Sequence, residues 1–128
     1  MLDVKDLNIE FHDHLVPETV VHQVSFHMDA GEIVGLVGES GSGKSMTALA
    51  IAGLLSRHDM KKTGEILFEG TDLLHCERSF LRELQGNDIS VVFQEPMTSL
   101  NPVFTIGYQI EESLILHKGM DKKAARQQ

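Results

Sequence analysis

Eight consecutive residues have the types and spacing needed to bind a phosphate group. They follow the pattern G-x-x-x-x-G-K-[ST] and are Gly38, Glu39, Ser40, Gly41, Ser42, Gly43, Lys44 and Ser45. Glycines let the backbone approach an anion closely, because they have no Cβ atom. The lysine of the pattern supplies a mobile positive charge, and the hydroxyl after it can ligate Mg²⁺. The pattern therefore predicts a site for the phosphates of a nucleoside triphosphate.

The segments on either side of this loop are those that a phosphate site requires. Residues 33–37 are a short, β-branched apolar run, which predicts a strand buried on both faces of a parallel sheet. Residues 45–55 are rich in Ala and Leu and predict a buried helix. The loop would then end at a helix N-terminus, whose free N–H groups and dipole favour an anion. The motif alone does not separate ATP from GTP, or a kinase from a GTPase or a motor.

A second candidate residue follows another apolar run. Residues 89–93 also predict a buried strand, and Gln94 comes directly after them. Ligands bind at the carboxyl ends of strands in a doubly wound sheet, so we expect Gln94 at the same edge as the phosphate loop. Its side-chain oxygen would ligate Mg²⁺ or position a water molecule. The alternative is a surface glutamine that begins a loop.

The N-terminal segments predict a β-sheet. Residues 2–11 and 20–28 alternate imperfectly between apolar and polar and predict an antiparallel hairpin with a long connection. In the second segment the residues expected on one face are Val20, His22, Val24, Phe26 and Met28. Residues 56–63 predict a loop, and residues 64–70 predict a further strand between glycines.

The C-terminal segments predict helices. Residues 77–84 have helix-forming types with apolar spacing. Thr105 is a candidate N-cap for a helix that runs to about residue 117, where Gly119 would end it. Asp121 is a candidate N-cap for a last, short helix.

Composition and charge exclude several classes of protein. The chain has 128 residues, 41% of them hydrophobic, which is enough for a core. One Cys excludes a disulfide framework and a Cys-rich zinc module. The net charge of −8 weighs against nucleic-acid binding. No apolar run is long enough to span a membrane, and the N-terminus lacks the features of a signal peptide, so a cytoplasmic setting is expected.

Two stretches resemble the ATP-binding subunits of ABC transporters. They are residues 37–45, V-G-E-S-G-S-G-K-S, and residues 92–102, V-F-Q-E-P-M-T-S-L-N-P. The second stretch and residues 106–110 are similar to the oligopeptide, dipeptide and nickel importer branch. The resemblance covers the whole chain but only the first half of the family's nucleotide-binding domain. It implies an α/β fold: a partial P-loop NTPase core with an N-terminal antiparallel β-subdomain and the start of a helical subdomain at about residues 103–128.

The resemblance implies roles for individual residues. Residues 38–45 would hold the β- and γ-phosphates of ATP, with Ser45 as a Mg²⁺ ligand. Gln94 would be the catalytic glutamine of the Q-loop, residues 94–102, and would contact Mg²⁺ or the attacking water. Residues 95–101 would sense the coupling helix of a membrane-spanning partner.

The residue that stacks on adenine is a separate expectation. The family places an aromatic residue near the end of the first strand, and Phe11 is the candidate here. The stretch after it varies among family members, so His14 or His22 could lie near the base instead.

The activity and partners implied are those of an energy-coupling ATPase. The subunit would drive an importer for dipeptides, oligopeptides or a related small solute such as nickel. Its partners would be integral membrane permease subunits, a second ATP-binding subunit in a homo- or heterodimer and, indirectly, a solute-binding protein. Nucleic acid is not an expected partner. The subunit would lie at the cytoplasmic face of the membrane as a peripheral protein.

Several parts of the family pattern do not occur in this sequence. Residues 103–128 contain no Leu-Ser-Gly-Gly type signature loop, no Asp-Glu pair after an apolar strand and no corresponding histidine. We therefore expect residues 1–128 to be the N-terminal part of one nucleotide-binding domain, without ATP turnover of its own. Alternatives are a non-transport ABC ATPase and a non-catalytic nucleotide-binding or interaction module. A GTPase would need an Asn-Lys-x-Asp motif, which is absent.

Overall fold

The computed structural model describes residues 1–12, 16–55, 59–94 and 100–128. The chain divides into two compact units, which are described separately. The first unit is Met1–Leu81 and the second unit is Arg82–Gln128.

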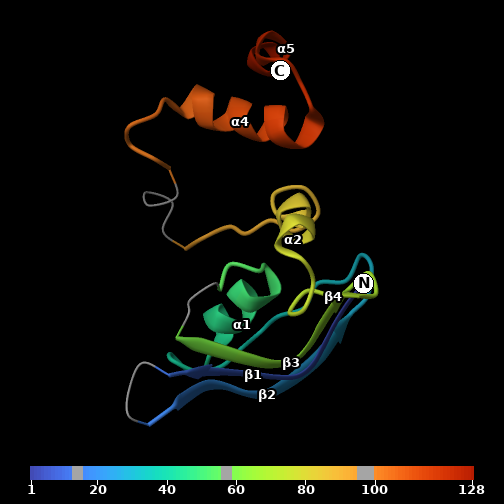
Figure 1. Ribbon diagram of the computed structural model, residues 1–128, viewed down its shortest axis with the longest axis vertical. Helices are drawn as coiled ribbons and strands as arrows, with labels where there is room; N and C mark the ends of the chain where they lie inside the picture. The colour runs from blue at the N-terminus through green and yellow to red at the C-terminus, as the bar shows by residue number, and fades with distance from the viewer. Residues whose placement is uncertain (13–15, 56–58, 95–99) are drawn as a thin grey trace. The chain divides into compact units, whose positions relative to one another are not determined.

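The first unit is built on a four-stranded antiparallel sheet (Figure 1). Its strands are β1, Leu2–Phe11; β2, Glu18–Met28; β3, Met60–Phe68; and β4, Thr71–Asp72. The order across the sheet is β2-β1-β3-β4. The predicted hairpin of the first two strands is confirmed. The loop predicted over residues 56–63 is wrong from Met60 onward, because these polar residues pair with the end of β1.

The imperfect alternation of β1 has a structural cause at Asp6. This residue has a left-handed backbone, with φ 47°, and the register to both neighbouring strands shifts around it. A bulge inserts one extra residue and reverses which face the following side chains occupy. Val4 and Leu7 therefore point to the same face, and both are buried.

A second left-handed residue, Gln23, makes the face predicted for part of β2 wrong. Gln23 has φ 43°, and the buried residue before it is Val21, whereas Val20 and His22 are more exposed. Val24, Phe26 and Met28 lie on the face predicted for them. The prediction that Val20 and His22 share this face is wrong. The Asn8 side-chain oxygen accepts the Gln23 N–H at 3.0 Å, which satisfies the backbone at this bulge.

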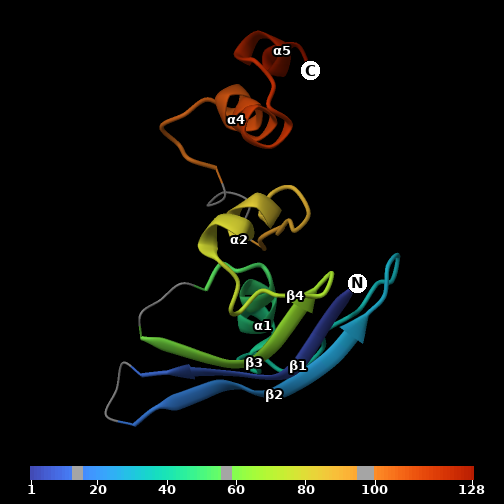
Figure 2. The same ribbon diagram turned by 45° about the vertical axis from the view of Figure 1, so that its right-hand side comes forward.

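One helix covers the buried face of this sheet. Helix α1, Lys44–Ile51, lies over β1 and β3 in both views (Figures 1 and 2). Thr47 and Ala50 are its buried residues, one turn apart, and they face a core of sheet residues. The fully buried sheet side chains of that core are Val4, Leu7, Ile9, Val21 and Ile66. The predicted helix is thus confirmed but shorter, ending before Gly53, which has φ 68°.

Three further helices are described, and the predicted caps of the last two are confirmed. Helix α2 is Arg78–Leu84, α4 is Ile106–Lys118 and α5 is Lys122–Gln127. Thr105 caps α4 by accepting from the Tyr108 N–H, and Gly119 ends it with φ 61°. Asp121 caps α5 by accepting from the N–H groups of Lys123 and Ala124. Local capping chemistry is enough to define these ends.

The two predicted parallel strands are wrong for the described structure. Residues 32–39 and 90–93 belong to no strand, and Ile89 makes only an isolated bridge to Gln85. Ile33 is 96% exposed and Val92 is 98% exposed. A parallel strand obtains its backbone hydrogen bonds and its burial from neighbouring strands. Among the described residues no strand lies beside either segment.

No helix in the described part of the chain is both long and apolar enough to cross a membrane.

Candidate functional site

The phosphate loop ends at the N-terminus of α1. Gly43 is the N-cap residue, with φ 85° and ψ 0°, and within the described residues no side-chain cap bonds the first N–H groups of the helix. These N–H groups therefore remain available to a ligand, and the helix dipole favours an anion there. Gly41 also has a left-handed backbone, with φ 80°. At Gly38 a Cβ atom would lie 2.7 Å from the Ser42 Oγ, so a larger residue there would require the Ser42 side chain to move.

The Lys44 side chain bonds back to this loop. Its Nζ donates to the carbonyl oxygens of Gly38 at 2.8 Å and Glu39 at 2.5 Å, and to the Ser42 Oγ at 3.2 Å. The ammonium group is thus held at the loop without any carboxylate partner among the described residues. A cation in that position can contact a phosphate at the same loop.

A cavity of about 180 Å³ opens beside the loop. Its lining residues are Val20, Gly41, Ser42, Gly43, Lys44, Ser45 and Met46. Val20 comes from β2, so the sheet contributes one wall and the loop and helix contribute the other. The structure therefore brings residues 41–45 of the predicted loop together around one hollow at the helix N-terminus, whereas Gly38, Glu39 and Ser40 are not among its lining residues.

Ser45 has the chemistry expected of a cation ligand. It is exposed in the first turn of α1 and lines the cavity, and its hydroxyl makes no hydrogen bond to another described residue. An unengaged hydroxyl oxygen is a suitable ligand for Mg²⁺ beside phosphate groups. In the described residues there is no group of three or more His, Cys, Asp or Glu side chains that could hold a metal ion by themselves.

Phe11 lies at the end of β1, on the hairpin that contributes Val20 to the cavity. It pairs with Glu18 of β2 and Met60 of β3 and is half-buried. His22 is exposed on β2, whereas His14 lies outside the described residues. The register places Phe11 on the strand next to Val20, but its role toward an adenine stays a prediction.

Gln94 belongs to the second unit, in a segment without helix or strand. Its side chain is exposed. Residues 95–99 of the predicted Q-loop lie outside the described residues. Because Ser45 and Gln94 are in different units, their joint binding of Mg²⁺ stays a prediction.

Gln109 shapes the turn before α4, a role that the sequence alone does not predict. From α4 its Oε1 accepts the Asn101 N–H at 2.8 Å, and its Nε2 donates to the carbonyls of Asn101 at 3.0 Å and Phe104 at 3.1 Å. Three bonds from one amide fix the turn that leads into α4. The only signal in the sequence was a polar residue in the first turns of a helix that follows an Asn-Pro pair.

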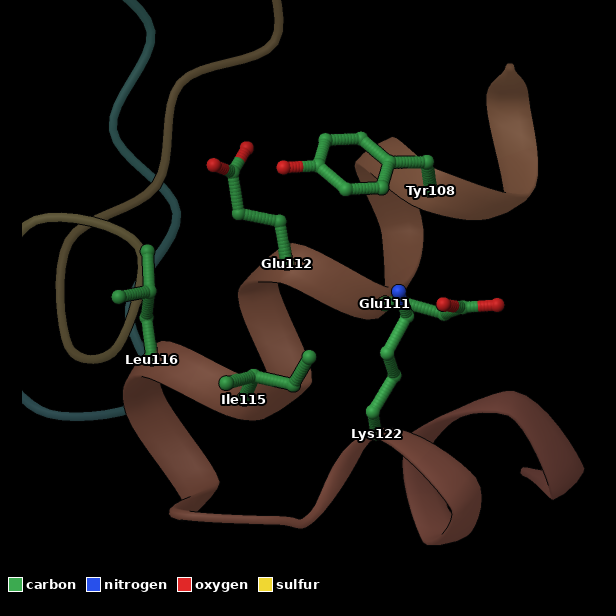
Figure 3. A pocket seen from close by; sticks show the side chains of 6 residues that line it. All are labelled: Tyr108, Glu111, Glu112, Ile115, Leu116 and Lys122. Carbon is green, nitrogen blue, oxygen red and sulfur yellow. The ribbon is translucent and has the colours of Figure 1, made fainter. Parts of the chain in front are cut away.

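A second cavity, of about 320 Å³, lies within the second unit between α4 and α5 (Figure 3). Its lining residues are Tyr108, Glu111, Glu112, Ile115, Leu116 and Lys122. In Figure 3 the Tyr108 ring and the Glu112 carboxylate lie on the same side of α4, and Lys122 reaches up from α5 toward Glu111. Arg126 forms an ion pair with Glu111 at 3.8 Å. No residue of the phosphate loop contributes to this cavity.

Two titratable groups among the described residues of the first unit have a shifted pKa, and neither lines the cavity at the N-terminus of α1. Burial acts to raise the pKa of Asp72, but hydrogen bonds from His75 and from the N–H groups of Leu74 and Ile66 outweigh it, so this pKa is lowered. Burial and the nearby charge of Arg78 lower the pKa of Lys62. Asp72 thus serves to hold the turn around β4, where it accepts from His75 Nδ1 at 2.6 Å.

Known proteins resemble this chain in sequence. The ABC transporter family matches residues 21–128. The dipeptide transport ATP-binding protein DppD of Haemophilus influenzae is 46% identical over 98% of this chain and 38% of its own length. The oligopeptide transport ATP-binding protein AppD of Bacillus subtilis is 49% identical over 99% of this chain and 39% of its own length. The chain therefore spans less than half the length of these relatives.

Solved structures resemble it in fold. The dimeric structure of MJ0796, a bacterial ABC transporter cassette, has a TM-score of 0.82 at 23% identity and covers 99% of this chain and 53% of that chain. A post-hydrolysis state of the MJ0796 cassette bound to ADP and Pi has a TM-score of 0.80 at 22% identity. These likenesses confirm the fold class predicted from the sequence.

Proposed function

The chain belongs to the ABC transporter family of ATP-binding proteins, and on this premise we propose that it binds ATP for the energy-coupling subunit of an importer. The observation that carries the proposal is the cavity at the N-terminus of α1, where Lys44 and unbonded helix N–H groups meet. These are donors for the β- and γ-phosphates. Phe11 is the proposed stacking partner of the adenine.

Mg²⁺ would accompany the nucleotide. Ser45 offers a hydroxyl oxygen inside the cavity, and the side-chain oxygen of Gln94 is the second proposed ligand. The bound ion would offset the negative charge of the phosphates during transfer to water. Gln94 is also the residue proposed to orient the attacking water.

The proposed cargo is a dipeptide or oligopeptide, with nickel or a related small solute as the alternative. The names of the relatives from Haemophilus influenzae and Bacillus subtilis, which are peptide transport proteins, support this choice. The cargo would be selected by the other components of the transporter.

The proposed partners are permease subunits, contacted through residues 94–102, and a second ATP-binding subunit. A solute-binding protein would act indirectly. The dimeric cassette among the similar structures supports the pairing of two ATP-binding subunits. The subunit would then work at the cytoplasmic face of the membrane as a peripheral protein.

Residues 1–128 alone would not turn ATP over, because they contain no signature loop and no Asp-Glu pair. A colorimetric phosphate assay tests whether residues 1–128 alone hydrolyse ATP. The full-length subunit with its permease partners should release phosphate continuously, and the 128 residues alone should stay at the background rate. Multiple turnover by the 128 residues that disappears in Lys44→Ala would contradict the proposal.

A further inference from the structure

One buried polar side chain in the first unit is not accounted for by the phosphate motif. Thr47 lies in α1, two residues beyond the end of the motif, and is only 2% exposed. A buried hydroxyl is unfavourable unless it makes a hydrogen bond. Threonine is also a poorer helix former than alanine. The partner of this hydroxyl is therefore informative.

The hydroxyl of Thr47 bonds to the phosphate loop. Thr47 Oγ1 donates to the carbonyl oxygen of Gly43 at 3.0 Å. The backbone N–H of Thr47 donates to the same oxygen at 2.8 Å. Side-chain bonding to the residue four positions earlier is common for threonine in helices, but here the acceptor is the last glycine of the loop.

Gly43 is held from its other side by β2. A Cβ atom on Gly43 would lie 2.5 Å from the Val20 carbonyl oxygen and 3.0 Å from Val21 Cγ2. The backbone of Gly43 thus packs directly on the strand. Val20 is also the strand residue that lines the phosphate cavity. Gly43 is therefore fixed between a strand on one side and Thr47 on the other.

Fixing this carbonyl also fixes the next N–H group. The Gly43 carbonyl and the Lys44 N–H belong to one planar trans peptide unit, in which they point in opposite directions. Because the carbonyl is directed down α1 toward Thr47, the Lys44 N–H is directed out of the helix N-terminus, where the cavity lies. No side-chain cap bonds the N–H groups there.

We infer that Thr47 is a positioning residue, which anchors the Gly43 carbonyl and so aims the Lys44 N–H at the bound phosphate. The inference rests on the proposed ATP binding. It assigns a role to a residue outside the motif, one that acts only through the backbone of Gly43.

The Thr47→Val variant separates positioning from packing. It keeps the β-branched shape and leaves no buried group unbonded, because the backbone N–H still reaches the Gly43 carbonyl. Its thermal unfolding midpoint should stay at or above that of the wild type, while its affinity for Mg-ATP falls about three- to tenfold, the effect of one neutral hydrogen bond. Wild-type affinity in this variant would overturn the inference.

The Thr47→Ser variant should give the opposite pattern. It keeps the hydroxyl but removes a buried methyl group, so the unfolding midpoint should fall while the Mg-ATP affinity stays within about twofold of wild type. A loss of affinity in parallel with stability would overturn the inference. Thr105→Val is the matched control, since it removes a backbone-bonded threonine hydroxyl from the second unit and should leave affinity unchanged.

An NMR measurement without nucleotide keeps this test separate from the proposed function. In the full chain, ¹⁵N relaxation should show that the Lys44 amide becomes more mobile in Thr47→Val but not in Thr47→Ser. An unchanged Lys44 amide in Thr47→Val would contradict the positioning role. If the wild type binds neither Mg-ATP nor pyrophosphate, the proposed function fails, and the relaxation data still decide the role of Thr47.

Discussion

The first unit, Met1–Leu81, and the second unit, Arg82–Gln128, bury their apolar residues to very different extents. Among the described residues, ten of the twelve buried hydrophobic residues lie in the first unit, and only Leu84 and Ala125 lie in the second. Helix α4 has no buried residue, although it carries an apolar stripe. The phosphate loop is thus attached to a packed layer, whereas the second unit is defined mainly by local helix caps.

Neighbouring strands, and not residue type, account for much of this difference. Ile9 and Ile33 are the same residue type, Ile9 in a segment of alternating apolar and polar residues and Ile33 in an apolar run. Ile9 is 0% exposed in a strand paired on both sides, and Ile33 is 96% exposed in a segment that has no strand neighbour in the described part of the chain. Stability should therefore depend on side-chain packing in the first unit and on capping in the second.

The largest expected difference concerns matched isoleucines. Ile66→Ala removes a side chain that is 0% exposed in the first unit, and it should cost about 2–5 kcal/mol of unfolding free energy through lost burial and a cavity. Ile110→Ala removes a side chain that is 60% exposed on α4, and it should change the free energy by no more than about 0.5 kcal/mol. Urea denaturation measures both, and equal effects would contradict the contrast.

Glycine replacements should give the next largest difference. Gly64 has φ 100°, and a Cβ atom there would lie 2.5 Å from the carbonyl oxygens of Asp6 and Lys5. Gly64→Ala should therefore cost about 2–4 kcal/mol, from backbone strain and from the clash. Gly119 has φ 61° with open space around it, so Gly119→Ala should cost only about 1 kcal/mol. Thermal unfolding distinguishes the two, and a milder effect at Gly64 would refute the close packing of β1 and β3.

Removing a cap should have a smaller, local effect. Asp121→Ala deletes the acceptor of two N–H groups at the start of α5 and should destabilise this helix by about 1 kcal/mol. Faster amide hydrogen exchange confined to α5 would show it. Glu112→Ala, which removes an exposed carboxylate without a capping role, should leave the exchange of α5 unchanged.

The smallest expected effect is a pH dependence in the first unit. The pKa of Asp72 is lower in the folded than in the unfolded state. Its contribution to stability is therefore complete above the ordinary value of about 3.9 and is lost as pH falls through the folded pKa. Urea midpoints between about pH 6 and pH 2.5 should converge for wild type and Asp72→Asn as the solution is acidified. Curves that stay parallel would exclude this role of Asp72.

Features set by local chemistry could be predicted from the sequence. The glycine-rich loop, the caps at Thr105 and Asp121 and the end at Gly119 depend on a few adjacent residues, and the hairpin joins two segments that follow each other in the chain. The glycine spacing also identified where a cavity forms beside Lys44.

Features set by tertiary pairing could not be predicted. The face reversals at Asp6 and Gln23 use left-handed backbones at residues other than glycine, which leave no clear sequence signal. The start of β3 at Met60 depends on pairing with distant Phe11. Residues 33–37 have the composition of a buried strand, but none of the described strands lies beside them. The bonds of Gln109 and Thr47 likewise depend on the observed geometry of their loops.

The most direct test of the central claim is an isothermal titration with Mg-ATP. The wild-type chain should bind, and Lys44→Ala should bind about 10- to 100-fold more weakly, because it loses a charge-assisted contact to phosphate. Lys118→Ala, which removes an exposed lysine of the second unit, should bind like the wild type. Equal binding by the wild type and Lys44→Ala would contradict the assignment of residues 38–45 as the phosphate site.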